Sequence, residues 1–139
     1  MTIIAAVTDS RVSSHALVEA VAEAKQLGTD LVLVNLRNTK LDVTNLDTDG
    51  LTVTVVDRRG MSKEDAADAV LSEIEARNAT RLVIGVNRRT PVGKAILGSL
   101  SQQLLLNSPI PVLAVKLPDD GLPASAFENL PGGMRRVTG

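Results

Sequence analysis

Residues 1–36 read MTIIAAVTDSRVSSHALVEAVAEAKQLGTDLVLVNL, and this stretch decides the fold. The apolar run Ile3 to Val7 ends in turn-forming residues, as expected of a strand that is buried on both faces. A helical stripe of apolar residues follows, with one of the serines at 13–14 as the predicted N-cap and Gly28 as the predicted C-cap. A second apolar run, Leu31 to Leu36, completes a β-α-β unit with parallel strands and a right-handed crossover.

The rest of the chain continues this alternation of strands and helices. Further strands are predicted at Leu51 to Asp57, Leu82 to Val86 and Val112 to Lys116, and a polar loop is predicted from Arg37 to Gly50. Helices are predicted from Ser62, which forms a capping-box pattern with Asp65, to Asn78, and from Ser99 to Asn107. These elements predict an α/β fold with a doubly wound, five-stranded parallel sheet of order 3-2-1-4-5, the fifth strand lying at an edge.

The chain has the length of one domain, 139 residues. We expect residues 1–117 to form this domain. Residues 118–139 are rich in Pro, Gly, Ser and Asp without helical or strand periodicity, so we expect a flexible C-terminal tail. The only aromatic residue, Phe127, lies in that tail, where it and Leu130 are candidates to anchor it on a neighbouring surface.

Composition excludes several classes of function. Aromatic residues make up only 1% of the chain, so the core must be aliphatic and a bound base cannot stack on an aromatic ring. Fifteen basic and sixteen acidic residues leave almost no net charge, which argues against nucleic acid or anionic lipid as partner. There is no cysteine, and the N-terminal apolar run of about five residues is too short for a signal peptide or a membrane span. We expect a soluble, cytoplasmic protein without a membrane partner.

Ligands of such sheets bind beyond the carboxyl ends of the strands, where the strand order reverses between the first strand and the fourth. Two segments of this chain should meet there, 8–10 and 85–101. Residues 85–116 read GVNRRTPVGKAILGSLSQQLLLNSPIPVLAVK, in which Gly98 and Ser99 open a helix. Exposed backbone amides at a helix start, together with the Ser99 and Ser101 hydroxyls, predict a phosphate site.

This segment resembles the universal stress protein family. That family carries, after its fourth strand, a glycine, two residues, a second glycine, nine residues, and then a third glycine followed by Ser or Thr. Gly85, Gly98 and Ser99 stand at the first, third and fourth of these positions. Ser101 and Gln102 match the residues that usually follow in the family. The opening segment IIAAVTDSRVSSHAL also looks like that of the family, so the resemblance spans about residues 1 to 117.

The resemblance implies an adenine nucleotide alpha hydrolase-like fold and a stress-response binding and signalling module rather than an enzyme. It implies ATP with magnesium as ligand, with Thr8, Asp9 and Leu36 beside the base and ribose. Gly85, Gly98, Ser99 and Ser101 would surround the phosphates, and Arg88 and Leu100 complete the implied site. It also implies a homodimer through the last strand, comprising Val112, Leu113, Ala114, Val115 and Lys116. An apolar edge strand with unpaired backbone groups gives this dimer a physical basis.

Two departures from the family pattern concern the nucleotide. Members that bind ATP usually have an aspartate directly after the first strand, where this chain has Thr8, with Asp9 displaced by one. The second glycine is replaced by Arg88. Its side chain either closes the pocket or, with Arg89 and Lys94, replaces amide contacts to phosphate by charge pairing. The alternative is therefore a dimeric stress protein that binds no nucleotide and acts by protein contact.

Two further classes fit less well. Asp9, Asp57 and Lys116 are also compatible with a phosphoacceptor receiver domain, but a receiver needs an acidic pair after the first strand and a helix where this chain has the polar loop. An adenylating or pyrophosphatase enzyme on a related sheet usually shows a Ser-Gly-Gly phosphate loop or paired histidines. The segment TDSRVSS contains neither.

Overall fold

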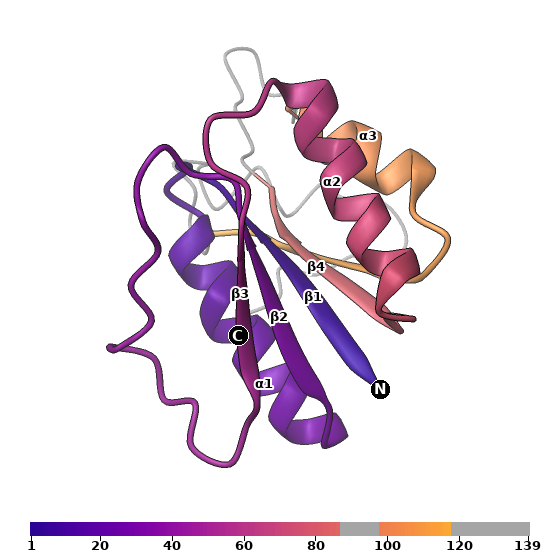
Figure 1. The fold of residues 1–139 in the computed structure, drawn as a ribbon. Helices are drawn as coiled ribbons and strands as arrows, with labels where there is room; N and C mark the ends of the chain where they lie inside the picture. Colours follow the sequence, from indigo (N-terminus) through magenta and orange to yellow (C-terminus); the bar gives the residue numbers. More distant parts are fainter. Residues whose placement is uncertain (87–97, 118–139) are drawn as a thin grey trace, which may run out of the picture.

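The computed structural model describes residues 1–86 and 98–117, which form one α/β unit (Figure 1). The strands are β1 (Thr2–Val7), β2 (Asp30–Asn35), β3 (Val53–Asp57), β4 (Arg81–Gly85) and β5 (Val112–Val115), and the helices are α1 (Ser13–Leu27), α2 (Lys63–Ala76) and α3 (Ser99–Asn107). All neighbouring strands are parallel, and the sheet order is β3-β2-β1-β4-β5. The predicted fold and strand order are confirmed.

The strand β1 is the centre of the molecule. It pairs with β2 on one side and with β4 on the other, and no residue from Ile3 to Val7 is more than 4% exposed. A continuous apolar run suits this position because both faces of the strand are covered by other elements.

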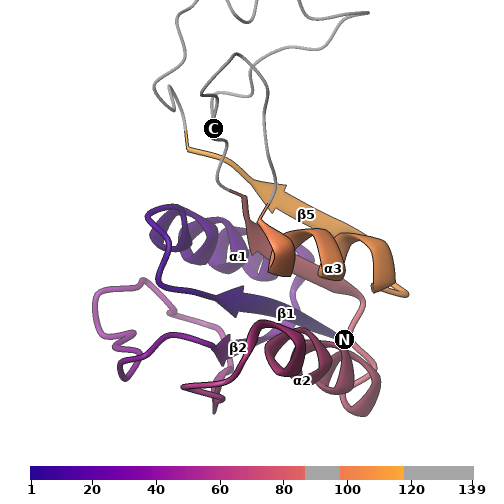
Figure 2. The same ribbon diagram turned by 90° about the horizontal axis from the view of Figure 1, so that it is seen from above.

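Side chains alternate between the two faces of the sheet and build two apolar cores. On one face α1 packs on the odd-numbered residues of β1, and on the other α2 and α3 pack on the even-numbered ones (Figure 2). The buried apolar side chains of both cores are aliphatic, as the composition predicted. Apart from Ser13, Thr29 and Asn35, the buried residues of the described interior are thus Leu, Ile, Val and Ala.

The connection between β2 and β3 contains no regular helix, as predicted, yet it contributes to the core. Leu41 is 7% exposed, and Val43, Leu46 and Leu51 pack against the same cluster as α1. Asp42 organises the turn, since its Oδ1 accepts hydrogen bonds from the backbone N–H and the hydroxyl of Thr44, which lower the pKa of Asp42. This irregular segment therefore covers part of the face that α1 leaves open.

The helix ends follow the predicted signals with one exception. Gly28 ends α1 in the left-handed region (φ 65°), and the Ser62 hydroxyl caps α2 by accepting the Asp65 N–H. The predicted serine N-cap of α1 is wrong: Val12 occupies the cap position, and no side chain caps the helix. Ser13 instead turns its hydroxyl toward the backbone N–H of Thr8.

Two strands are shorter than predicted, because each pairs with its neighbouring strand over fewer residues than the sequence indicates. The first residue of β3 is Val53 rather than Leu51, since the pairing with β2 starts at Leu31 opposite Val53. The last residue of β5 is Val115 rather than Lys116, because Val115 already lies opposite Gly85 at the end of β4. Within the described ranges, no helix is long and apolar enough to cross a membrane.

The order of the sheet excludes the receiver alternative. A receiver has the flavodoxin-like order 2-1-3-4-5, in which the third strand lies directly beside the first. Here β2 lies between β1 and β3, so Asp57 at the end of β3 is separated from the β1 loop by a whole strand.

Thr29, just before β2, provides a test of the packing. It is 4% exposed, and its hydroxyl has no hydrogen-bond partner among the described residues. Replacing Thr29→Val removes this unsatisfied group at nearly constant volume, so we expect the free energy of unfolding to rise by about 1 kcal/mol. Urea denaturation measures this change. Thr29→Ser keeps the hydroxyl and should give no gain, and a destabilised valine variant would contradict the expectation.

Candidate functional site

The parallel strands bring the loops after β1, β2 and β3 and the end of β4 to one edge of the sheet, where α3 also starts (Figure 1). The Ser101 hydroxyl, in the first turn of α3, donates to the carbonyl oxygen of Gly85 at 3.4 Å. A Cβ atom placed on Gly85 would lie 2.6 Å from Cγ1 of Val12. The start of α3, the end of β4 and the loop after β1 therefore adjoin one another.

None of the described residues covers the start of α3. Gly98 occupies the N-cap position without a capping side chain, and the first turn holds no acidic residue. A Cβ on Gly98 would meet no described atom within 4 Å, and Ser99 is exposed. Leu100 turns away from this opening and packs against the core shared by α2 and α3. Backbone N–H groups and the positive end of the helix dipole thus face the carboxyl edge, an arrangement that suits an anion.

Three hydroxyls close the loop after β1. The oxygens of Thr8, Ser10 and Ser13 lie 3.0 to 3.4 Å from one another, and the Thr8 N–H donates to Ser13 Oγ at 3.0 Å. Each hydroxyl can donate to the next, so the ring satisfies itself. Thr8 thus contributes a hydroxyl that is already engaged within its own loop.

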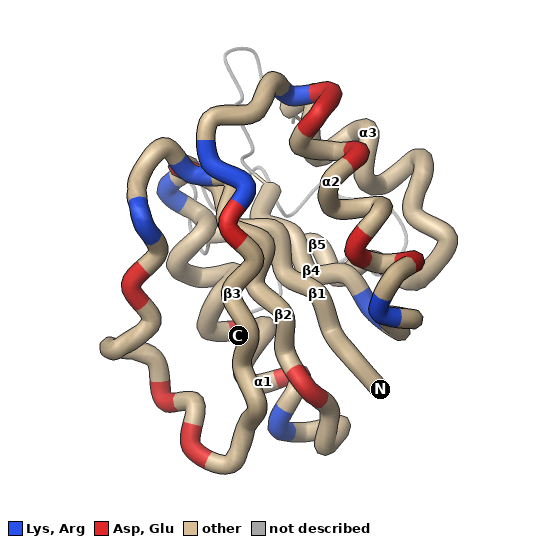
Figure 3. Tube along the Cα trace, in the orientation of Figure 1, with Lys and Arg blue, Asp and Glu red and all other residues tan. Residues whose placement is uncertain are grey.

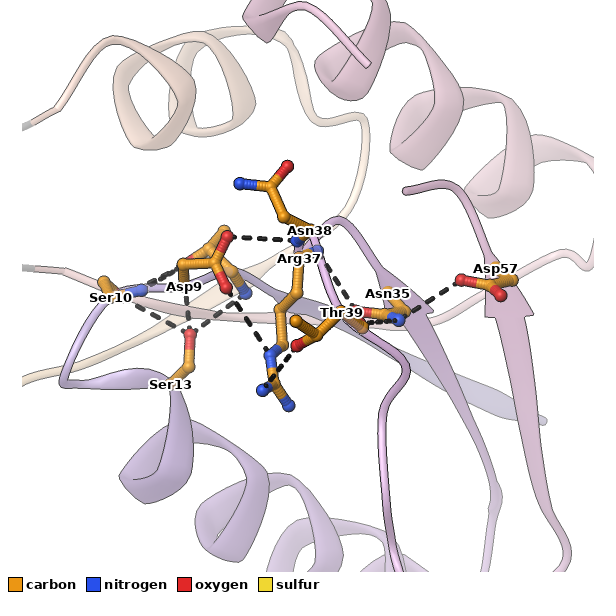
Figure 4. Close-up of polar contacts among 9 residues, drawn as sticks. Asp9, Ser10, Ser13, Asn35, Arg37, Asn38, Thr39 and Asp57 are labelled. Atoms are coloured by element: carbon orange, nitrogen blue, oxygen red, sulfur yellow. Dashed lines mark hydrogen bonds and ion pairs between the residues drawn. The ribbon is translucent and has the colours of Figure 1, made fainter. Parts of the chain in front are cut away.

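Asp9 connects the loops after β1 and β2 (Figure 4). Its Oδ2 accepts the backbone N–H of Asn38 at 3.1 Å, and its Oδ1 lies 3.7 Å from Nε of Arg37. Leu36 lies between these loops, where its N–H donates to the carbonyl oxygen of Val7 at 2.8 Å. The structure thus brings Thr8, Asp9 and Leu36 together.

Asn35 is a residue of this edge that the sequence analysis missed. It is 1% exposed, and its side chain bonds to the segment 37–39 and to Asp57 (Figure 4). A buried asparagine that ends the apolar run LVLV was the available signal, because a buried polar group needs partners. Because the whole run Leu31 to Leu36 fits a strand, Asn35 was assigned to that strand and to no site.

Basic and acidic side chains both lie at this edge (Figure 3). The described loops and the first turn of α2 carry Arg11, Arg37, Lys40, Arg58, Arg59 and Lys63, and also Asp9, Asp42, Asp57, Glu64 and Asp65. A shallow cavity of about 450 Å³ lies beyond β2 and β3, lined by Asn38, Asp57, Arg59 and Gly60.

Two parts of the predicted site stand apart. Arg88, with Arg89 and Lys94, lies outside the described residues. Within residues 1–86 and 98–117, no cluster of three or more His, Asp or Glu side chains could hold a metal ion. A magnesium ion at this edge would therefore have to be held largely by the phosphates of a nucleotide.

Comparisons with known proteins agree with this architecture. Residues 50–116 match the sequence model of the Universal stress protein family. A universal stress protein from Mycolicibacterium smegmatis is 52% identical over 52 residues, which are 37% of this chain and only 40% of that protein. A universal stress protein from Archaeoglobus fulgidus DSM 4304 has a similar solved structure, with a TM-score of 0.64 and 25% identity over 86% of this chain and 45% of that one.

A second solved structure carries a ligand. It is the universal stress protein from Archaeoglobus fulgidus in complex with dAMP, similar with a TM-score of 0.60 and 20% identity over 84% of this chain and 98% of that chain. The sheet order and helix placement define an adenine nucleotide alpha hydrolase-like α/β fold. Taken with the match of residues 50–116, they show that this chain is similar to universal stress proteins in its fold and in that part of its sequence.

The contact between Gly85 and Val12 can be tested by a pair of substitutions. In Gly85→Ala the new methyl group would overlap Val12 Cγ1, so we expect a loss of about 1–3 kcal/mol in the free energy of unfolding. In the double variant with Val12→Ala the methyl group has room, so the two losses should not add. A double-mutant cycle of chemical denaturation measures the coupling. Strictly additive losses would contradict the contact.

Proposed function

We propose that this chain is a stress-response binding and signalling protein that holds an adenine nucleotide at the carboxyl edge of its sheet. One observation carries the proposal: the uncapped start of α3 opens on the edge where Thr8, Asp9 and Leu36 lie together. The backbone N–H groups at the start of α3 support a ligand that carries phosphate. The dAMP complex of the related Archaeoglobus fulgidus protein supports an adenine base.

In this proposal Leu36 packs against the adenine, and Thr8 and Asp9 bind the ribose. Leu36 is only partly buried, so its side chain can cover an aromatic base without a stacking ring. The backbone N–H groups around Gly98, with the hydroxyls of Ser99 and Ser101, bind the phosphates, and Mg²⁺ arrives with them. Gly85 lies at the base of the site, where a residue without a side chain is needed because a Cβ atom would overlap Val12.

We propose binding rather than catalysis. The carboxylates of this edge, Asp9 and Asp57, are each paired with an arginine and a hydrogen-bond donor. Neither is therefore placed as a free general base for hydrolysis.

A second candidate function, a stress protein that acts only by protein contact, is favoured by a different observation. Asp9 is held by Arg37 and Asn38, and the Thr8 hydroxyl belongs to a closed ring. A nucleotide would have to replace these partners, whereas a protein that binds none would leave them unchanged.

Ligand binding separates the two candidates. ATP with magnesium at about a hundred times its dissociation constant should add roughly 2.7 kcal/mol to the stability of the protein, visible as a rise in melting temperature. Ser99→Glu should abolish this rise, because a carboxylate at the helix start repels phosphate while it suits the helix dipole and leaves the fold intact. Ser99→Ala serves as the control for loss of the hydroxyl alone. If ATP does not move the melting temperature of the wild-type protein, the protein-contact candidate stands.

We further propose a homodimer in which the β5 strands of two copies pair antiparallel. Within the described residues β5 pairs with β4 alone. The carbonyl oxygens of Pro111 and Val115 point to β4, where they accept the N–H groups of Leu82 and Val86. Because backbone groups alternate along a strand, those of Val112 and Ala114 point outward. An exposed edge of this kind is prone to pair with a second strand.

A proline at the outward position tests the dimer. Ala114→Pro removes an N–H that points away from β4, so we expect the fold to persist and the dimer to dissociate at micromolar concentrations. Ala114→Val places a branched side chain at the same position but keeps the N–H, and it should remain dimeric. Sedimentation velocity distinguishes the species. A wild-type chain that sediments as a monomer, or a proline variant that stays dimeric, would rule out pairing through β5.

A further inference from the structure

Asn35 is the most completely bonded polar side chain of the carboxyl edge. Its Nδ2 group donates to the carbonyl oxygen of Thr39 at 3.0 Å and to Oδ1 of Asp57 at 3.2 Å. Its Oδ1 accepts the backbone N–H of Arg37 at 3.1 Å. The residue is 1% exposed, so these bonds are shielded from water. A buried amide costs free energy unless its partners are in place, whereas an aliphatic side chain would continue the apolar run without that requirement.

The partners of Asn35 dictate an amide and exclude a carboxylate. Two acceptors, Thr39 O and Asp57 Oδ1, face the Nδ2 side, and one donor, the Arg37 N–H, faces the Oδ1 side. An aspartate has the same shape, but in place of the Nδ2 group it would put a carboxylate oxygen. This oxygen is an acceptor, and it would face two other acceptors, Thr39 O and Asp57 Oδ1. It would also put two carboxylates in hydrogen-bond contact, which repel while both are ionised.

These bonds fix the segment that forms one wall of the proposed nucleotide site. Arg37 and Thr39 are held directly, and the backbone of Asn38 lies between them. The Asn38 N–H and the Arg37 side chain are in turn the partners of Asp9 (Figure 4). Contacts therefore connect Asp57 of β3 through Asn35 and the segment 37–39 to Asp9 in the loop after β1. Leu36 lies between Asn35 and this segment in the chain.

We propose that Asn35 is the positioning residue of the nucleotide site. It holds the segment 36–39 so that Leu36 faces the base and Asn38 and Arg37 hold Asp9 at the mouth of the crevice. This inference rests on the proposed nucleotide function and goes beyond it. It assigns the geometry of the base and ribose end of the site to a buried side chain that does not itself touch the ligand.

The test replaces Asn35→Asp and measures the ATP-magnesium dissociation constant by calorimetry at about pH 8 and about pH 5. At the higher pH, repulsion from Asp57 and Thr39 should displace the segment and weaken binding at least about tenfold, since small displacements at a binding site are costly. Burial and the neighbouring carboxylate raise the pKa of the introduced carboxyl group. This group therefore regains a proton as the pH falls, donates again, and should restore most of the wild-type affinity.

Three controls separate positioning from loss of stability. The wild-type protein at both pH values corrects for titration of the nucleotide. Asn35→Ala should bind weakly at both pH values, because it cannot regain a donor. Val21→Ala creates a cavity in the core beneath α1, on the face of the sheet opposite Leu36, and should lower stability without changing the dissociation constant. In the unliganded protein, amide hydrogen exchange at Arg37 and Asn38 should accelerate in both Asn35 variants.

The outcomes are distinct. Weak binding by Asn35→Asp that recovers in acid, with Val21→Ala unaffected, supports the proposal. Wild-type affinity in Asn35→Asp at both pH values, or unchanged exchange at Arg37 and Asn38, overturns it while the nucleotide function stands. Failure of the wild-type protein to bind ATP overturns the proposed function, and the positioning role with it.

Discussion

The parallel pairing of β1 with β2 on one side and β4 on the other is the constraint on which the rest depends. It requires a strand without polar side chains, and Ile3 to Val7 supply one. Because every strand runs in the same direction, every strand ends at the same edge. The loops that follow β1, β2 and β3 and the end of β4 are therefore brought together by the sheet itself, however far apart they lie in the chain.

Polar groups at this edge are satisfied by one another. The hydroxyl ring around Thr8, the pairing of Asp9 with the β2 loop and the bonds of Asn35 leave few free acceptors in the described loops. The start of α3 is different, because its backbone donors are uncapped. The edge thus combines a preformed, internally bonded side with an open side. In such an arrangement phosphate binding and ribose binding have different energetic demands, since the backbone N–H groups of α3 can bind phosphate without losing a side-chain cap, whereas Thr8, Asp9 and the Ser101 hydroxyl must exchange existing bonds.

The sequence predicted the elements whose causes are local. Continuous apolar runs gave four of the strands, Gly28 gave the end of α1, and Ser62 gave the start of α2. The predicted N-cap of α1 failed because Ser13 bonds back to Thr8 in the loop before the helix rather than to its own helix. The role of Asn35 was missed for a different reason, since its partner Asp57 comes from another strand. The motif residues Gly85, Gly98 and Ser99 indicated the family from the sequence. The contact that Val12 would make with a side chain at position 85 is seen only in the three-dimensional structure.

The position of β1 has a consequence for synthesis of the protein. On the ribosome, the first β-α-β unit emerges long before β4, yet Ile3 lies opposite Arg81 and Ala5 opposite Val83. Until those residues leave the exit tunnel, one edge of the most apolar strand has no partner and is exposed to other chains. In a nascent chain this apolar edge of β1 therefore stays unpaired until translation has passed β4.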